Sequence, residues 1–114
     1  MKYDIELKTN HNIPEELKEF IENNNSFRII IDDSLEEFET LKPIEILRAY
    51  MEQDDLYDYD IIPFALLDDD YLCIYYINNE ISIIYWSTER ALESKEHAIF
   101  KLFDSYKDFI NECK

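Results

Sequence analysis

The amino-acid sequence predicts an α+β fold in which a central, mainly antiparallel sheet is flanked by about three helices. Its 114 residues suit one domain, and the 46% of apolar residues are enough to fill one core. Short segments with the two-residue period of strands are interspersed with segments that have the period of helices. No repeat or linker is recognisable, so residues 1–114 are expected to form a single acidic domain.

The first third of the chain predicts a strand, a helix and a second strand. Residues 1–8 alternate between apolar and charged side chains, which is typical of a half-buried strand. Asn12 as a cap and Pro14 in the first turn then favour a helix, which is expected to end at Asn23–Asn25. Phe27–Ile31 predicts a short buried strand.

Residues 32–40 are acidic and fit neither period clearly, whereas Pro43 predicts the start of a second helix. The apolar side chains expected to point inward from this helix are Ile44, Leu47, Tyr50 and Met51. An acidic loop is expected over 54–60. Ile61–Leu67 is expected to be a strand that bends at Pro63, because proline lacks the N–H that a ladder needs.

A hairpin is the clearest local prediction. Tyr71–Tyr76 and Ile81–Trp86 are strand-like, and Asn78-Asn79 suits a two-residue turn because asparagine tolerates positive φ. After it, residues 87–98 predict a loop with a short helical piece, and the last helix is expected to begin near Phe100.

The expected turn fixes which side chains of the hairpin share a face. One face carries the pairs Tyr71–Trp86, Cys73–Ile84 and Tyr75–Ser82. The other face is more apolar and is expected to be core: Leu72, Ile74, Tyr76, Ile81, Ile83 and Tyr85. The first face presents aromatic types that dominate protein interfaces. A helix that covers this face is the alternative, and both possibilities stay open.

The formal net charge of −16 constrains the partners. Nucleic acid and an anionic membrane surface repel such a protein, whereas a basic protein is attracted to it. A role in solubility alone is the alternative. The pattern is more specific than the total, because no Lys, Arg or His occurs between Arg48 and Arg90. That stretch contains the acids Glu52, Asp54, Asp55, Asp58, Asp60, Asp68, Asp69, Asp70, Glu80 and Glu89.

A partner-binding surface is therefore predicted where this basic-free stretch adjoins the first face of the hairpin. Its acidic rim and its aromatic anchors are, in chain order, Asp54, Asp55, Asp58, Asp60, Asp68, Asp69, Asp70, Tyr71, Tyr75 and Trp86. Rim charges are expected to set the association rate, and buried aromatics the dissociation rate.

Catalytic chemistry finds little support in the sequence. The chain has no glycine, so phosphate-cradling loops and nucleophile elbows are excluded. His11 and His97 lie in polar segments, and Cys73 lies in a strand as a packing residue. The acidic runs at 58–60 and 68–70 lack the pattern of a calcium loop. We therefore expect no enzyme activity, no cofactor and no metal.

A cytoplasmic location is expected from the remaining features. The N-terminus has charges where a signal peptide needs an apolar core, and the longest run without a polar residue, Ile61–Leu67, is too short to cross a bilayer. Cys73 and Cys113 do not suggest a disulfide framework.

Several segments together resemble the SUKH superfamily. Ile13–Asn24 is similar to its opening Leu-Pro helix, and Ile61–Ala65 followed by Asp68–Tyr71 and Cys73 is similar to its Pro-Phe-Ala signature. Tyr85-Trp86 and Ser105–Ile110 resemble the strand and helix that close the domain. The match covers roughly residues 13 to 110. The sequence departs from the family at the usual glycines and at residues 1–8, where the family has a helix.

The resemblance implies a SUKH-like fold and a role as an immunity protein that binds and neutralises a bacterial toxin, often a basic nuclease. Its partner is then a secreted or contact-dependent toxin domain. Two alternatives stay open: a general interaction or regulatory module of the same fold, and an acidic mimic of nucleic acid. The order of genes discriminates between the first two, because a toxin gene directly upstream favours immunity.

Overall fold

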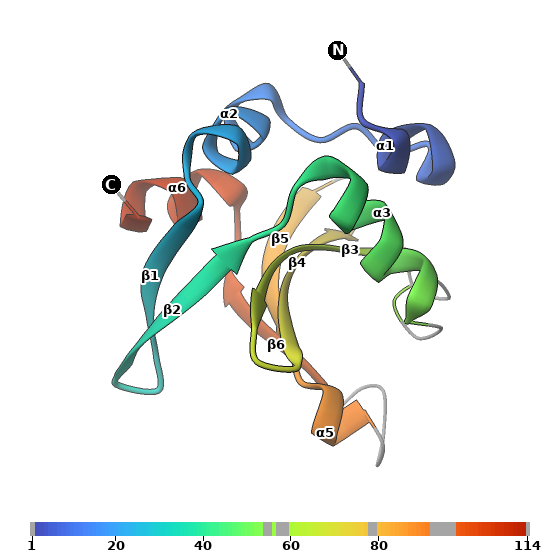
Figure 1. Cartoon of the computed structure of the whole chain (residues 1–114). Coiled ribbons are helices and arrows are strands. Elements are labelled where there is room, and N and C mark those ends of the chain that lie inside the picture. Colours follow the sequence, from blue (N-terminus) through green and yellow to red (C-terminus); the bar gives the residue numbers. More distant parts are fainter. Residues whose placement is uncertain (1, 54–55, 57–59, 78–79, 92–97, 114) are drawn as a thin grey trace.

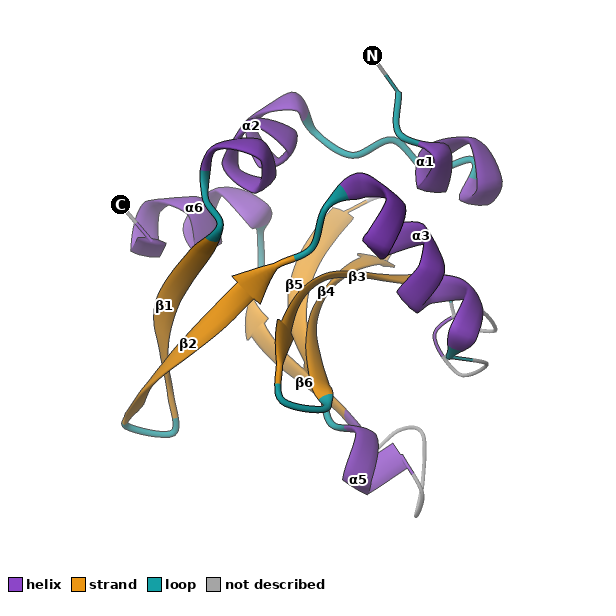
Figure 2. Cartoon of the chain, viewed as in Figure 1, coloured by secondary structure: helices purple, strands orange, loops and turns teal. Residues whose placement is uncertain are grey.

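The computed structural model describes residues 2–53, 56, 60–77, 80–91 and 98–113. In this part of the chain, six strands form one antiparallel sheet in the order β1-β2-β3-β4-β5-β6, so each strand lies beside its neighbour in sequence. The sheet is curled, and helices lie on both sides of it (Figures 1 and 2). The predicted α+β class with a mainly antiparallel sheet is confirmed, with five described helices.

The elements follow one another in a simple order. The strands are β1 (Ser26–Ile31), β2 (Ser34–Thr40), β3 (Ile61–Leu67), β4 (Asp70–Ile77), β5 (Glu80–Trp86) and β6 (Ile99–Phe103). The helices are α1 (Asp4–Thr9), α2 (Glu15–Asn23), α3 (Pro43–Glu52), α5 (Thr88–Ala91) and α6 (Tyr106–Cys113).

The expected strand over residues 1–8 is wrong, because this segment forms α1. The carboxylate of Glu6 accepts a hydrogen bond from the Tyr3 backbone N–H at 2.8 Å, and Asn10 ends the helix in the left-handed region with φ 61°. Glu6 is buried and Leu7 is 68% exposed, so the alternation that suggested a strand breaks at these two positions. The helix that the resemblance to the SUKH superfamily implies for this segment is therefore present.

A buried ion pair explains why Glu6 points inward. Lys18 Nζ of α2 lies 2.5 Å from Glu6 Oε1, and the Ile13 backbone N–H donates to Glu6 Oε2 at 2.7 Å. Burial acts to raise the pKa of Glu6, but Lys18 and the two backbone donors together lower it below the ordinary value. The pair thereby ties α1 to α2.

The structure also resolves one segment that the sequence left open and corrects the start of the last helix. Residues 32–40 include β2, which is joined to β1 by Asp32 and Asp33 with φ 51° and 65°, the positive values of a two-residue hairpin turn. The last helix does not begin near Phe100, because 99–103 alternate as β6 and α6 starts after Ser105. The Ser105 hydroxyl accepts from the Asp108 N–H at 3.2 Å, so it caps this helix.

The predicted inward face of α3 is correct only in part. Tyr50 is buried and Leu47 packs against the core, but Ile44 and Met51 are exposed. Ile46 and Ala49 are buried instead. Apolar residues occupy two faces of this helix, so the periodicity alone did not identify the covered one. The end of α2 also differs from the prediction. The residue that follows the helix, Asn24, has an extended backbone with φ −128°, and not the left-handed conformation expected of the cap.

The hairpin of β4 and β5 has the predicted register. Tyr71 pairs with Trp86, Cys73 with Ile84 and Tyr75 with Ser82. Both strands have neighbours on both sides, since β3 flanks β4 and β6 flanks β5. The predicted turn at Asn78-Asn79 lies outside the described residues. The bend expected at Pro63 is confirmed by a register shift between Pro63 and Ala65.

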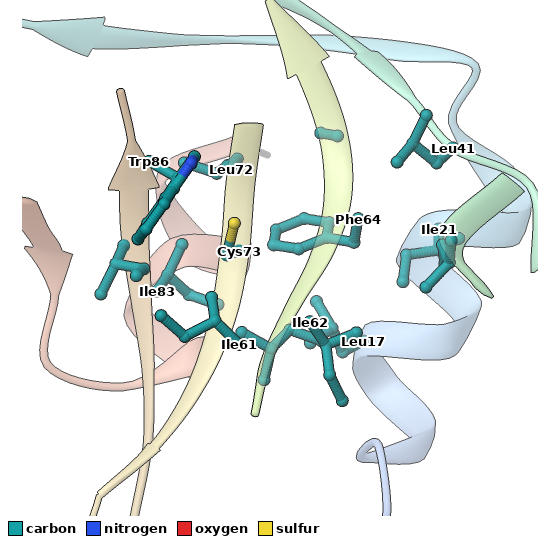
Figure 3. Packing of buried hydrophobic residues seen from close by; sticks show 14 of the residues in the cluster. Leu17, Ile21, Leu41, Ile61, Ile62, Phe64, Leu72, Cys73, Ile83 and Trp86 are labelled. Atoms are coloured by element: carbon teal, nitrogen blue, oxygen red, sulfur yellow. The ribbon is translucent and has the colours of Figure 1, made fainter. Parts of the chain in front are cut away.

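Phenylalanine rings form the centre of the core on the Leu72/Ile74/Ile83 face. The ring centroid of Phe109 in α6 lies 5.1–5.7 Å from those of four others: Phe20, Phe27, Phe64 and Phe103. Phe103 is the β6 partner of Ile83, which places α6 on the predicted face. Figure 3 shows Leu17 and Ile21 of α2 pointing toward Ile62 and Phe64 of β3.

Candidate functional site

The aromatic half of the predicted surface is covered. Trp86 is only 1% exposed, and Tyr71 and Tyr75 are half-buried. Tyr71 hydrogen-bonds Gln53 and lies near Glu52, so the C-terminal end of α3 lies over this face of the hairpin. Burial raises the pKa of the Tyr71 phenol, with Glu52 as a further cause. The alternative that a helix covers this face holds, and Trp86 is not available as an anchor in the free protein.

The acidic half is divided between two ends of β3. Asp54, Asp55 and Asp58 lie outside the described residues. Asp60, just before β3, accepts a hydrogen bond from the Tyr50 hydroxyl at 2.7 Å and lies 3.4 Å from His11 Nε2. Asp68–Asp70 follow β3, whose seven residues span about 20 Å. The structure therefore does not bring Asp60 together with Asp68–Asp70.

The three aspartates after β3 differ in their surroundings. Asp68 and Asp69 are exposed, and Asp68 occupies the left-handed region with φ 53°, which glycine and, after it, asparagine and aspartate adopt most readily. Asp70 is half-buried, and its carboxylate accepts bonds from the Tyr85 hydroxyl and from the Thr88 N–H at 2.9 Å. Burial raises the pKa of Tyr85, and the bond to Asp70 adds to this effect. Asp70 therefore fastens α5 to the sheet, whereas Asp68 and Asp69 are available to a partner.

Sequence reasoning left residues 32–40 undefined, and they carry further acidic side chains to this same end of the sheet. Asp32, on the β1–β2 turn, and Asp70 line one groove of about 370 Å³. Asp68 is shared by two other grooves, one with Glu37 and Glu39 and one with Glu89. We call this region the acidic end; its carboxylates are those of Asp32, Asp33, Glu36, Glu37, Glu39, Asp68, Asp69, Asp70 and Glu89.

The basic side chains near the acidic end have partners. Arg28 Nε lies 3.2 Å from Glu37 Oε1, and Lys101 Nζ lies 3.1 Å from Asp104 Oδ1. The Arg90 guanidinium lies 5.0 Å from the centroid of the Phe100 ring. Carboxylates outnumber these cations at the acidic end, so its net charge is negative.

The described residues offer little for catalysis. Burial raises the pKa of the Cys73 thiol well above its usual range, and burial together with Glu112 raises that of Cys113 to about 11. Both thiols are free and protonated at neutral pH. His11 stacks on Tyr76 with ring centroids 4.2 Å apart, and His97 lies outside the described residues. Within the ranges given above, no three His, Cys, Asp or Glu side chains are grouped as metal ligands.

No helix in the described ranges combines the length and the apolar character needed to cross a membrane.

Comparison with known proteins gives one match. The model of the SMI1/KNR4 family (SUKH-1) matches residues 4–112, which extend from the start of α1 almost to the end of α6. The comparisons with curated proteins and with solved structures gave no match.

Proposed function

Since the chain belongs to the SMI1/KNR4 family (SUKH-1), we propose that it is an immunity protein that binds and neutralises a cognate bacterial toxin. The observation that carries this proposal is the family match over residues 4–112, because it extends over every described element except the last residue of α6. In this role the protein acts by occupying the toxin and not by catalysis. The proposed encounter takes place in the cytoplasm of the cell that the protein protects.

The charge of the protein supports a basic toxin, and a nuclease in particular. A nuclease holds the phosphate backbone of its substrate in a basic cleft. A protein of net charge −16 is attracted to such a cleft, which raises the association rate and disfavours acidic partners. The same charge repels nucleic acid and anionic membranes, so neither is a proposed partner.

The proposed contact surface is the acidic end. Asp68 and Asp69 are exposed there, and Glu89 joins them in a groove of about 390 Å³ between the β3–β4 turn and α5. Asp54, Asp55 and Asp58 remain sequence-based candidates. Asp60 stands at the far end of β3, bonded to Tyr50, so we assign it no direct role at the acidic end.

The proposal is tested with the product of the neighbouring toxin gene. Wild-type protein should co-purify with that toxin and protect cells that express it; if it does neither, the immunity proposal fails. In binding kinetics, Asp68→Asn with Asp69→Asn should slow association several-fold at low salt and change dissociation little, because rim charges act mainly on the encounter.

A matched control separates location from net charge. Glu16→Gln with Glu19→Gln removes the same charge from an exposed part of α2, away from the acidic end. This control should associate nearly as fast as wild type. Equal slowing of both double variants would mean that the acidic end is not the contact surface, and that only the total charge matters.

A further inference from the structure

We propose that the open edge of β2 binds an extended, basic segment of the partner as an added strand. This inference rests on the proposed function, because the toxin is the partner that supplies the segment. It adds the surface of the protein that the toxin contacts and the mode of binding. On the edge of β2 that faces β3, only Glu39 and Thr40 are paired, with Leu66 and Ala65, and the described residues place no other strand along this edge. Residues 34–38 are therefore paired on the β1 side only, and the β1–β2 hairpin forms an arm (Figure 1).

The ladder determines which backbone groups are open. The Thr40 N–H donates to the Asn25 carbonyl at 2.9 Å, and the two-residue turn at Asp32-Asp33 closes the same ladder. In an antiparallel pair, the residues between hydrogen-bonded pairs direct their N–H and C=O to the opposite edge. Leu35 and Glu37 are such residues, so their backbone groups point toward the open side. Unpaired groups of this kind are the template for strand addition.

The side chains beside this edge suit an extended segment. Leu35 and its cross-strand partner Ile30 are 61% and 62% exposed, although both are aliphatic. A groove of about 470 Å³ runs between the arm and the end of β3, with Phe38, Leu66 and Leu67 among its lining residues. An added strand buries apolar side chains against Leu35 and in this groove, which adds to the backbone bonds.

The charges of the arm select a basic segment. Asp32, Asp33, Glu36, Glu37 and Glu39 are the acidic residues of 26–40, and Arg28 is its one basic residue. Both side chains of the Arg28–Glu37 pair are exposed, so the pair contributes little to stability. Little free energy is therefore lost when a cation of the partner approaches Glu37 and replaces Arg28. A second copy of this chain would bring like charges together along the edge. The occupant is therefore a basic segment of another protein, with lysine or arginine alternating with apolar residues.

A synthetic peptide of alternating lysine and valine tests the binding mode directly on the whole protein. Its binding should slow hydrogen exchange at the Leu35 and Glu37 amides, and leave the Arg28 and Ile30 amides of the outer β1 edge unchanged. A peptide of alternating glutamate and valine should not bind. A third peptide is the lysine–valine peptide with every second backbone nitrogen methylated. It keeps the positive charge but lacks those N–H donors, so it should bind more weakly than the unmethylated peptide. Equal binding of the methylated peptide, or protection at the β1 edge, would overturn the proposal.

Proline variants test the same edge in the complex. Leu35→Pro removes an N–H from the open edge of β2, and Ile30→Pro removes one from the outer edge of β1, at directly opposed positions. Each also removes one exposed aliphatic side chain, so the pair is matched. Leu35→Pro should lose toxin binding several-fold relative to Ile30→Pro. Equal binding by the two variants would overturn the proposal, and melting curves show whether either is unfolded. If either is, the peptide experiment on wild-type protein decides.

The two proposals fail separately. If wild type protects against the toxin and folded Leu35→Pro protects equally well, the immunity function stands and strand addition is wrong. If wild type does not protect but the lysine–valine peptide slows exchange at Leu35 and Glu37, the edge binds basic segments and the immunity function is wrong.

Discussion

The β1–β2 and β4–β5 hairpins of the sheet have similar lengths and different surroundings. In the β4–β5 hairpin, Cys73, Ile74, Ile83 and Ile84 are all buried, although they belong to opposite faces. In the β1–β2 arm, Phe27, Ile29 and Phe38 are buried, and Ile30 and Leu35 on the other face are exposed. The β4–β5 hairpin lies inside the sheet, and both of its faces are buried. The β1–β2 arm projects from the sheet, and only one of its faces is buried.

The difference separates stability from binding. Side chains of β4 and β5 contribute to the core whichever way they point, so substitutions there act on the free energy of unfolding. The outer face of the arm lies outside the core, so a partner can contact it without disturbing the fold. The following substitutions test how sharp this division is.

The largest effect is expected at Trp86. Trp86→Ala should lower the free energy of unfolding by about 3–5 kcal/mol, because a large buried side chain leaves a cavity. Ile30→Ala, on the outer face of the arm, should change it by less than about 0.5 kcal/mol. Urea denaturation of both variants measures the contrast. Similar losses in the two would mean that the arm's outer face is buried.

A smaller loss is expected from the charge pairs. Lys18→Met should lower the free energy of unfolding by about 3 kcal/mol, because it leaves the buried carboxylate of Glu6 without its cation. This value is at the lower end of the range for a broken buried ion pair, since Glu6 still accepts hydrogen bonds from two backbone N–H groups. Arg28→Met in the arm should cost no more than about 1 kcal/mol, since its pair with Glu37 is exposed.

The pH dependence of the same variants checks the cause. The pKa of Glu6 is lowered in the folded state, so the pair stabilises the protein above the ordinary carboxyl pKa, and this contribution is lost as the pH falls through the lowered value. Lys18→Met should therefore lose less stability than wild type on acidification over that window. Parallel losses would show that Glu6 is not responsible.

At the acidic residues Asp68–Asp70 we expect one moderate effect and one close to zero. Asp70→Ala should cost about 1.5–3 kcal/mol, because its carboxylate accepts bonds from Tyr85 and Thr88. Asp68→Asn should be nearly neutral at ordinary salt, since asparagine tolerates the left-handed backbone at this position.

The salt dependence of Asp68→Asn gives a finer test. At about 0.01 M salt its melting temperature should be slightly above that of wild type, and the gain should vanish near 0.1 M, where charge repulsion is screened. A gain that persists at 0.1 M would contradict repulsion as the cause. Equal losses for Asp70→Ala and Asp68→Asn would show that Asp70 does not fasten α5.

Local patterns were sufficient wherever one strong signal acted. The alternation of 71–76 and 81–86 about a two-residue turn predicted the β4–β5 register, and the proline signals located α3 and the bend in β3. They failed where a distant residue decided. The sequence pattern placed Glu6 on the exposed side, but Lys18, twelve positions along the chain, forms an ion pair with it and allows it to be buried. Residues 99–103 were expected to begin a helix, but they pair with β5 as an edge strand of the sheet.

The sequence by itself determined the fold class, the strong negative charge and the pairing within the central hairpin, because these depend on composition and on contacts between near neighbours. Only the tertiary structure decided that Trp86 is covered, that Asp60 and Asp68–Asp70 stand at opposite ends of β3, and that the edge of β2 is open. The physical reason is that burial and open edges depend on which element lies across a face or beside a strand, and those elements come from distant parts of the chain.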